Sequence, residues 1–445
     1  MATENNDILL GDGGDNEIHG LGGDDVINGL GGNDRLFGDA GNDVLTGGDG
    51  TDTLTGGTGV DTFQDTAAGL NGDTIQDFNI GDRIRITDLT KDTANIAIDG
   101  TNGNLLTYNG GSVDIANLGP GRLVIRAVEG GGVEIRLQQD AHNDFNGDGR
   151  SDVLLRNIDG TVTDWLANDR GGFTPNAANA LFGVPLDWHV IGTGDFNGDG
   201  RVDLLWHNND GTVTDWLGQP NGGFVSNAFY VTPNSSWHVI GTGDFNGDGH
   251  DDLLWQSTDG TITNWLGQAD GGFVSNAYYV RPDSSWHVTD TGDFNGDGIS
   301  DLLWRNDDGT ITDWLGQADG TFTSNAFYAT PDSSWHVAAI GDFNGDSISD
   351  LLWQNTDGTI TDWLGHADGT FTSNPVYLKA DSSWHLVGTG DFDGNAIDDL
   401  LWQNNDGTVT DWFGQTDGNF VGNPSYLNPG SSWHVQDPAA HDSIV

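Results

Sequence analysis

Residues 192–206 have the sequence Gly-Thr-Gly-Asp-Phe-Asn-Gly-Asp-Gly-Arg-Val-Asp-Leu-Leu-Trp, a motif that recurs through most of the chain. Asp195, Asn197 and Asp199 stand two positions apart, and Asp203 follows them. Carboxylate and amide oxygens at this spacing are typical ligands of a calcium loop, in which a glycine such as Gly200 suits a turn with positive φ. The apolar run that follows is typical of a strand. The stretch therefore predicts a calcium loop that joins two strands.

The loop occurs six times, with first acids at Asp144, Asp195, Asp244, Asp293, Asp342 and Asp391. The first step is 51 residues and the other four are 49 residues each. Each repeat also carries four short β-type runs separated by turn residues, and four antiparallel strands in a unit of this length predict one propeller blade. We expect six blades, with a seventh, degenerate blade as the alternative.

The ring is expected to close through the last repeat. The first unit lacks a Trp-His-Val segment before its loop, whereas residues 433–435 supply a spare one. Pairing of this C-terminal strand with the segment before Asp144 would account for both irregularities and would leave no exposed sheet edge.

The composition of the 445-residue chain is strongly acidic, with 68 Asp and Glu against 14 Lys and Arg and a formal net charge of -54. This balance argues against nucleic acid as a partner, because phosphate neutralisation requires basic residues. The acids are phased with glycine and apolar residues, which favours metal binding over disorder, and calcium would relieve their mutual repulsion and drive folding. The sequence has no cysteine, so no disulfide framework is expected. No apolar run is long enough for a membrane helix.

A second, shorter repeat occupies residues 7–64. One apolar residue recurs at every ninth position, at Leu9, Ile18, Ile27, Leu36, Leu45, Leu54 and Phe63. An acid recurs with the same period at Asp7, Asp25, Asp34, Asp43, Asp52 and Asp61, and Asn16 is the exception. This pattern resembles the glycine-rich nonapeptide of RTX proteins. The resemblance implies a parallel β-roll in which these six acids face calcium and the apolar residues fill the interior. The alternative is a glycine-rich flexible linker.

Residues 73–82, Asp-Thr-Ile-Gln-Asp-Phe-Asn-Ile-Gly-Asp, resemble the segment that caps the roll in the C-terminal domain of serralysin-type secreted proteases. Alternating stretches at 83–86, 95–98, 105–108, 123–128 and 133–137 are then expected to form a capping sheet. The His-Glu-x-x-His motif of the protease itself is absent from the sequence. The resemblance therefore implies that residues 1–140 form a calcium-binding roll with its cap.

The six loops resemble FG-GAP (VCBS-type) repeats, which occur in integrin-like propellers and in many bacterial surface proteins. The resemblance implies an all-β chain with a propeller over residues 141–445 and several bound Ca²⁺ ions. The implied ligands are Asp144, Asn146, Asp148, Asp152, Asp195, Asn197, Asp199, Asp203, Asp244, Asn246, Asp248, Asp252, Asp293, Asn295, Asp297, Asp301, Asp342, Asn344, Asp346, Asp350, Asp391, Asp393, Asn395 and Asp399. We expect weaker binding in the fifth and sixth loops, where Ser347 and Ala396 replace the turn glycine.

All 17 tryptophans lie in the propeller, and we expect those of the Trp206 and Trp216 type to pack between blades. A third type precedes histidine after a Pro/Ser-rich loop. It is interpreted either as a structural bracket at a strand start or as a sugar site. The candidate ligand-binding residues are Trp237, His238, Trp286, His287, Trp335, His336, Trp384 and His385. No second soft ligand shares the local spacing of these histidines, which disfavours a metal site there.

No catalytic constellation is visible, so we expect a protein that is not an enzyme. The leading hypothesis is a secreted or surface-attached bacterial calcium-binding protein whose propeller binds a glycan or an extracellular matrix or surface protein. The alternatives are a calcium-dependent polysaccharide lyase or hydrolase, and a structural component of a surface layer or matrix.

The two ends of the sequence bear on export. No basic and apolar signal-peptide pattern is seen at the N-terminus. Residues 442–445 are similar to the acid-plus-apolar ending of type I secretion substrates. We therefore expect export through the type I secretion machinery, to an extracellular or cell-surface location.

Overall fold

The computed structural model describes residues 3, 5–59, 61–79, 82–90, 94–99, 105–116, 122–127, 132–138, 141–168, 171–233 and 236–436. Residues 442–445, on which the secretion-signal resemblance rests, lie outside this part. The chain divides into two compact units, one formed by Met1–Gln139 and one by nearly all residues from Asp140 onwards. Both units are built from strands, and the second also contains the short 3-10 helix η1 (Ala177–Asn179).

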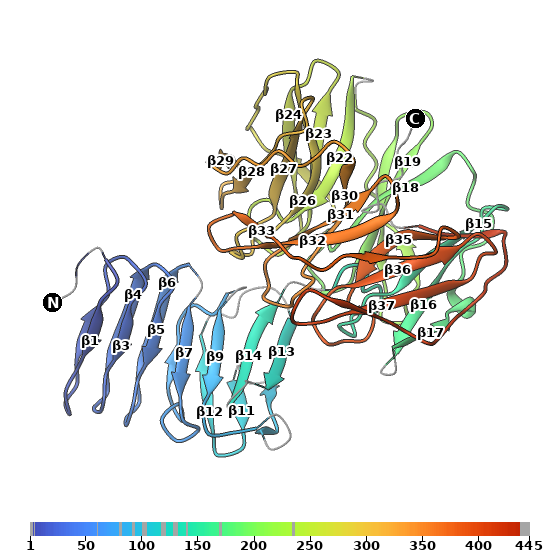
Figure 1. Cartoon of the computed structure of the whole chain (residues 1–445). Coiled ribbons are helices and arrows are strands. Elements are labelled where there is room, and N and C mark those ends of the chain that lie inside the picture. Colours follow the sequence, from blue (N-terminus) through green and yellow to red (C-terminus); the bar gives the residue numbers. More distant parts are fainter. Residues whose placement is uncertain are drawn as a thin grey trace. The chain divides into compact units, whose positions relative to one another are not determined.

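Two seven-stranded sheets form the first unit (Figure 1). One has the order β1 (Ile8–Leu10), β3 (Val26–Asn28), β5 (Val44–Thr46), β7 (Thr62–Asp65), β9 (Arg83–Ile86), β14 (Val133–Gln138) and β13 (Arg122–Ala127). The other has the order β10 (Ala97–Asp99), β11 (Leu105–Tyr108), β12 (Gly111–Ile115), β8 (Thr74–Ile75), β6 (Thr53–Thr58), β4 (Arg35–Ala40) and β2 (Glu17–His19). Successive nonapeptides alternate between the two sheets, so one turn of the roll takes two repeats.

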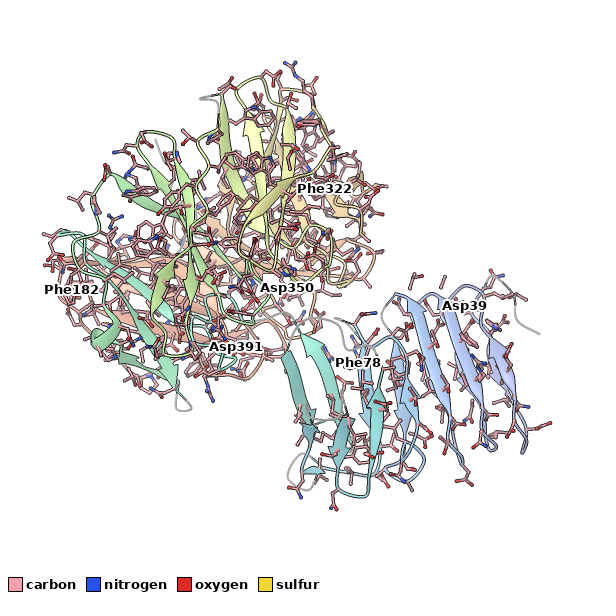
Figure 2. All side chains as sticks on the ribbon, turned by 180° about the vertical axis from the view of Figure 1, so that it is seen from behind. Asp39, Phe78, Phe182, Phe322, Asp350 and Asp391 are labelled. Atoms are coloured by element: carbon pink, nitrogen blue, oxygen red, sulfur yellow. The ribbon has the colours of Figure 1, made fainter. Side chains whose placement is uncertain are left out.

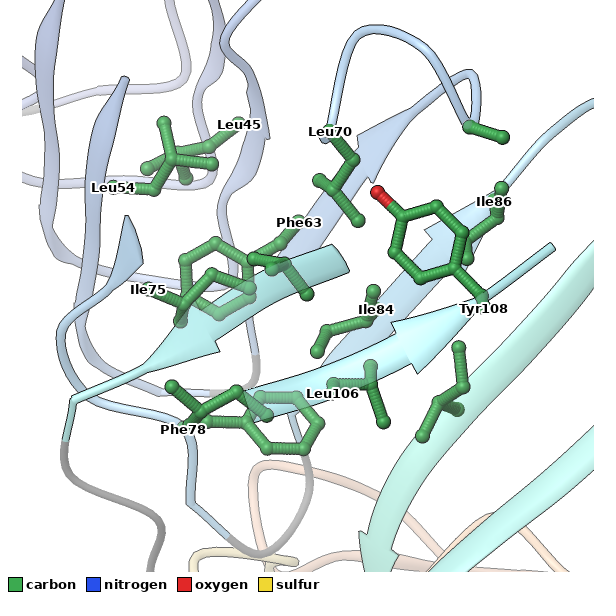
Figure 3. Packing of buried hydrophobic residues seen from close by; sticks show 14 of the residues in the cluster. Leu45, Leu54, Phe63, Leu70, Ile75, Phe78, Ile84, Ile86, Leu106 and Tyr108 are labelled. Carbon is green, nitrogen blue, oxygen red and sulfur yellow. The ribbon is translucent and has the colours of Figure 1, made fainter. Parts of the chain in front are cut away.

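The nine-residue period fixes the parallel register of the roll. Leu9 pairs with Ile27, Ile27 with Leu45 and Leu45 with Phe63, so the apolar residues stack along the interior. Leu36 and Leu54 do the same in the opposite sheet. Figure 3 shows the core where the roll continues into the cap, with Phe63, Ile75 and Phe78 packed between the sheets. The predicted β-roll is confirmed.

The strands expected in the capping region form, but they join the two sheets of the roll instead of making one capping sheet. Strand β12 is an additional one that sequence analysis missed. Strands β9, β14 and β13 extend one sheet of the roll, whereas β12, β11 and β10 extend the other. Pairing changes from parallel to antiparallel within these extensions, and the interior of the roll and the cap is one continuous apolar cluster.

The second unit is a propeller of six blades, which confirms the predicted number and rejects the alternative of seven. The first blade contains β17 (Gly172–Pro175), β16 (Val162–Asn168), β15 (Val153–Asn157) and β39 (Trp433–Val435). The second contains β18 (Trp188–Gly194), β19 (Asp203–Asn208), β20 (Val213–Gly218) and β21 (Phe224–Ser226). The third contains β22 (Trp237–Gly243), β23 (Asp252–Ser257), β24 (Ile262–Gly267) and β25 (Phe273–Ser275).

The remaining three blades repeat this plan (Figure 1). The fourth contains β26 (Trp286–Gly292), β27 (Asp301–Asn306), β28 (Ile311–Gly316) and β29 (Phe322–Ser324). The fifth contains β30 (Trp335–Gly341), β31 (Asp350–Asn355), β32 (Thr359–Gly365) and β33 (Phe371–Ser373), with β34 (Leu378–Lys379) also paired to β32. The sixth contains β35 (Trp384–Gly390), β36 (Asp399–Asn404), β37 (Val409–Gly414) and β38 (Phe420–Gly422).

The C-terminal strand closes the ring, as predicted, but with a different partner. Strand β39 pairs antiparallel with β15, which follows the first acidic loop, and not with the segment before Asp144. It thereby supplies the first strand of blade one. The first strands of consecutive blades contact one another from β18 to β35, which places them innermost in the ring.

The predicted packing of two tryptophan types is confirmed. Trp206 and its equivalents Trp255, Trp304, Trp353 and Trp402 are among the largest fully buried side chains. Each contacts the tryptophan of the following strand with tilted rings, as Trp206 does with Trp216, with ring centroids 5.1 Å apart. In blade one Leu155 takes the equivalent position, and the next residue, Arg156, lies over the Trp206 ring. Trp206 also packs with Leu154 and Val162 of blade one, so these tryptophans contribute to the core between neighbouring blades.

Candidate calcium sites and aromatic surface

A row of buried carboxylates follows the turns of the roll. Oδ1 of Asp43 accepts the backbone N–H of Asp25, one turn earlier, at 2.7 Å. The same bond joins Asp25 to Asp7, Asp34 to Asn16, Asp52 to Asp34, and Asp61 to Asp43. Asp25, Asp34, Asp43, Asp52 and Asp61 are each 1% exposed. One oxygen of each carboxylate is therefore committed to holding successive turns together.

The second oxygen of each carboxylate faces the interior of a turn. Among the described residues no hydrogen-bond partner is found for Oδ2 of Asp25, Asp34, Asp43, Asp52 or Asp61. A Cβ atom on Gly38 would collide both with Oδ2 of Asp43 and with the carbonyl oxygen of Gly56. Gly29 and Gly20 bear the same relation to Asp34 and Asp25. Carboxylate and carbonyl oxygens therefore converge where only glycine leaves room, and oxygen is the ligand that calcium prefers.

Burial of these carboxylates disfavours their charged form. Burial, with a smaller contribution from the neighbouring Asp25, raises the pKa of Asp43 to about 6. Burial likewise raises the pKa of Asp61 to about 7, with the charge of Asp43 adding to it. A row of buried like charges is costly unless protons or cations neutralise it.

The row extends further than sequence analysis proposed. Oδ1 of Asp73 accepts the N–H of Asp52 at 2.8 Å, and Oδ1 of Asp82 accepts that of Asp61 at 2.9 Å. These spacings are 21 residues instead of 18, which hid both acids from a strict nine-residue count. An acid two positions before an apolar strand residue was the signal that could have found them. At the N-terminal end of the row, Oδ2 of Asp7 accepts hydrogen bonds from the backbone N–H and the hydroxyl of Thr3. This predicted ligand therefore differs from the five predicted acids that follow it, for whose Oδ2 no such partner is found among the described residues.

In the propeller, each acidic loop leads into the second strand of its blade and folds around its first aspartate, and in blades two to six it also follows the first strand. The carboxylate of Asp144 accepts the backbone N–H groups of Gly147, Asp148 and Gly149 at 2.8, 3.1 and 2.6 Å. Asp195 likewise accepts those of Asp199 and Gly200. Gly200 has a φ of 78°, as its position in the motif predicts. These contacts curl each loop back onto its first aspartate.

The last aspartate of each loop is fully buried and ties the loop to the third strand. Oδ2 of Asp203 accepts the N–H of Phe196 at 3.1 Å, and Oδ1 accepts that of Gly218 at 2.7 Å. The equivalents in the other blades are Asp152, Asp252, Asp301, Asp350 and Asp399. Burial, together with the nearby charges of Asp195 and Asp199, raises the pKa of Asp203 to about 9. A nearby cation would reverse this shift.

The fifth and sixth loops keep the same turn without glycine. Ser347 and Ala396 have φ values of 72° and 65°, so both occupy the left-handed region. Their N–H groups bond to Asp342 and Asp391 at 2.8 Å, like the glycines in the other loops. In the sixth loop, Asp391, Asp393 and Asp399 each bring a carboxylate oxygen within 4.8 Å of the others. Asp350 and Asp391 are labelled in Figure 2. Weaker calcium binding by these two loops stays a prediction.

A second ring of buried acids holds adjacent blades together. Asp215, on the third strand of blade two, accepts Nδ2 of Asn227 at 2.9 Å, and the same amide reaches the carbonyl of Asp270 in the next blade. Equivalent acids occur in four other blades, and Asn264 takes the position in blade three. Burial raises the pKa of Asp215 to about 6. The amide in blade three shows that this position does not need a charge, which is consistent with a structural role.

The Trp-His segments begin the innermost strands, at the opposite strand end from the acidic loops. Each tryptophan is half-buried and packs on an inter-blade core, whereas each histidine is exposed. Trp237 also meets the ring of Tyr279 at 6.5 Å, and Trp286 meets Tyr328 at 6.4 Å. Trp335 and Trp384 make the same contact with Tyr377 and Tyr426. We call these four contacts the Trp–Tyr pairs.

The tyrosines of the Trp–Tyr pairs were missed from the sequence. All four are 59–60% exposed. Each follows its tryptophan by 42 residues, and this constant interval was the signal that could have found them. The tryptophans of the Trp-His segments therefore pack on the inter-blade core with one side and, together with the tyrosines, form a partly exposed aromatic surface with the other.

The exposed histidines are held by side chains of the neighbouring turn. Nε2 of His189 lies 3.1 Å from Oδ1 of Asn209, and Nε2 of His385 lies 2.9 Å from Oδ1 of Asn405. Nε2 of His287 lies 3.0 Å from Oδ1 of Asp307. In blade two His207 stands opposite His189, and burial, with the added effect of His189, lowers the pKa of His207.

These features define a two-module repeat protein, in which a β-roll with inward-facing acids precedes a six-bladed propeller with an acidic loop in every blade. Residues 1–36 and 28–63 match the model of the RTX calcium-binding nonapeptide repeat. Residues 144–206, 195–255, 244–304, 293–353 and 342–402 match that of the FG-GAP-like repeat. These latter matches together span more than half of the chain, which therefore belongs to the FG-GAP-like repeat family.

Solved structures with a similar fold are distant in sequence. The SapL1 lectin, solved in complex with alpha methyl fucoside, is 11% identical, with 63% of this chain and 97% of the lectin covered and a TM-score of 0.36. The β-propeller domain of Cps50 (Swd1) from Myceliophteria thermophila is 13% identical, with coverages of 69% and 88% and a TM-score of 0.39. Neither likeness informs on the ligand of this chain. No curated protein sequence matches it. In the described part of the chain, no helix is long and apolar enough to cross a membrane.

Proposed function

We propose that this chain is a secreted, calcium-stabilised bacterial protein whose propeller binds glycans through the Trp–Tyr pairs. The observation that carries the proposal is the repetition of one partly exposed aromatic pair in four consecutive blades, each beside an exposed histidine. Calcium would occupy the acid row of the roll and the six loops of the propeller. Its role would be to fix the scaffold, because the acidic loops of the propeller lie at the opposite strand ends from the Trp–Tyr pairs.

The chemistry of the Trp–Tyr pairs suits a pyranose ring. The exposed faces of tyrosine and tryptophan offer flat apolar area to the C–H groups of a sugar, and both side chains also carry a hydrogen-bonding group. His238 and its equivalents add a polar ring at the same edge. Four similar sites of low individual affinity would favour multivalent surfaces, because binding at one site raises the effective concentration at the next.

Export is the second part of this proposal. RTX nonapeptide repeats are typical of proteins that leave the cell by type I secretion, and the match over residues 1–63 supports that route. Calcium is scarce inside cells and abundant outside, so a chain whose acids need calcium to fold would fold after export. Expression with and without a type I transporter, followed by assay of the medium, tests this part.

Binding of polysaccharide-coated beads in millimolar calcium tests the glycan proposal. Tyr279, Tyr328, Tyr377 and Tyr426 are each changed to Ala in one variant. Because these side chains are largely exposed, the melting temperature is expected to stay within a few degrees while bead binding is lost. Tyr230→Ala is the matched control, since Tyr230 is equally exposed and no ring contact with Trp188 is seen between these described residues. Full bead binding by the fourfold variant on a polysaccharide that the parent protein binds would contradict the proposal and favour a structural role.

A further inference from the structure

Blade two differs from every other blade at one position of its second strand. In the register of β18 and β19, His189 is the direct partner of His207. The equivalent partners are Gln256, Arg305, Gln354 and Gln403 for the histidines of blades three to six, and Arg156 for His434 in blade one. Blade two therefore places two imidazoles at directly opposed positions of one sheet.

The geometry of an antiparallel pair brings such side chains together. Directly opposed residues project from the same face of a sheet, with Cβ atoms about 5 Å apart. His189 is exposed and His207 is half-buried, so the pair is open to solvent. Along the chain, no second soft ligand lies near the Trp-His segments, and local spacing alone therefore disfavours a metal there. The sheet supplies that ligand from 18 residues further on.

One of the two imidazoles is already oriented. Nε2 of His189 lies 3.1 Å from Oδ1 of Asn209. A carbonyl oxygen can only accept, so Nε2 carries the proton and Nδ1 keeps a free lone pair. Metal-binding histidines are commonly fixed in this way, with one ring nitrogen donating to an oxygen and the other facing the metal. Asp210, in the turn after β19, interacts electrostatically with His207 and would offset part of the charge of a bound cation.

We propose that His189 and His207 form a binding site for a divalent transition-metal ion such as Ni²⁺ or Zn²⁺, separate from the calcium loops. Imidazole nitrogen suits Ni²⁺, Cu²⁺ and Zn²⁺, whereas calcium prefers oxygen ligands. The site therefore stays available when the acid loops are saturated with calcium. Water completes the coordination shell of the ion.

Calorimetric titration of the untagged full chain with Ni²⁺, in saturating calcium, tests this site. The parent protein is expected to bind one Ni²⁺ ion per chain. His207→Gln recreates the pair found in blades three, five and six, and should weaken binding at least tenfold. Gln403→His should add a second ion, because His385 is already held by Asn405 at 2.9 Å, as His189 is by Asn209. His366→Gln removes an exposed histidine outside any such pair and should leave binding unchanged.

The outcomes separate the proposal from adventitious binding. Equal Ni²⁺ affinity in the parent protein and in His207→Gln would overturn it, as would an equal loss in His366→Gln. A Gln403→His variant that binds no additional ion would also count against the pair geometry. Circular dichroism of each variant in calcium checks that the propeller is intact, and the gain expected from Gln403→His cannot arise from unfolding.

Discussion

The backbone N–H of Ser151, in the first acidic loop of the propeller, donates a 2.8 Å hydrogen bond to the carbonyl of Asp391 in the last loop. The same bond links each later loop to the loop before it, as from Val202 to Asp144 and from Asp251 to Asp195. The six acidic loops therefore form a closed hydrogen-bonded ring. Strand β39 closes the ring a second time, at the level of the blades, through its antiparallel pairing with β15.

Removal of β39 should open this ring. A chain ending at residue 430 loses the first strand of blade one and leaves the edge of β15 unpaired. We expect a lower thermal midpoint and a larger hydrodynamic radius in calcium, measured by calorimetry and size-exclusion chromatography. A chain ending at residue 436 keeps β39 and is the control. Equal stability of the two chains would show that β39 does not hold the ring.

Asp43→Asn should impair calcium-driven folding of the roll. The amide oxygen can still accept the N–H of Asp25, but a neutral amide group replaces the inward-facing oxygen Oδ2. The calcium concentration at the midpoint of folding, followed by circular dichroism, should rise several-fold. Asp49→Asn is the control, because it removes the same charge from an exposed side chain. Equal midpoints for both variants would contradict a calcium role for Asp43.

Ser347→Gly should strengthen the fifth loop. Ser347 has a φ of 72°, which costs a non-glycine residue about 1 kcal/mol or more, and no hydrogen-bond partner is found for its buried Oγ within the described structure. Glycine removes both penalties, so the thermal midpoint and the calcium affinity of this loop should increase. Gly200→Ser is the converse change and should lower both in the second loop. A destabilised Ser347→Gly protein would show that the serine hydroxyl contributes to the site.

The response to pH should depend on calcium. Burial raises the pKa of Asp61 and Asp73 to about 7, of Asp82 to about 8 and of Asp203 to about 9, all above 3.8. A carboxyl group whose pKa is higher in the folded than in the unfolded chain stabilises the folded protein at pH values below its unfolded pKa. This stabilisation is lost as the pH rises through the folded pKa. Calcium-free protein should therefore melt at a lower temperature at pH 8 than at pH 5. Calcium competes with protons for these carboxylates, so the rise in melting temperature that it causes should be larger at pH 8. A rise of the same size at both values would contradict the assignment.

The sequence was sufficient for features that depend on neighbours along the chain. Six copies of the acidic loop that begins at Asp195 in blade two predicted six blades. The position of Gly200 in this motif predicted its positive φ. Both features follow from local spacing. The nine-residue period from Leu9 to Phe63 predicted the roll for the same reason.

Features that depend on register between distant strands were missed. The partner of β39, the placement of Tyr279 against Trp237 and that of His207 opposite His189 all arise from how strands pair and twist. Asp73 and Asp82 continue the acid row with a longer spacing, since the chain makes wider turns there. The continuation of both roll sheets through the cap likewise requires knowledge of the pairing of β9 with β14 and of β8 with β12.

Removal and return of calcium shows whether the phased acids are calcium sites on which folding depends. The full chain is stripped with chelator and titrated with calcium, while far-UV circular dichroism and the hydrodynamic radius are recorded. We expect a disordered roll and an expanded chain in chelator, followed by a compact β-rich protein at millimolar calcium. A spectrum and a radius that are unchanged by chelator would contradict this expectation.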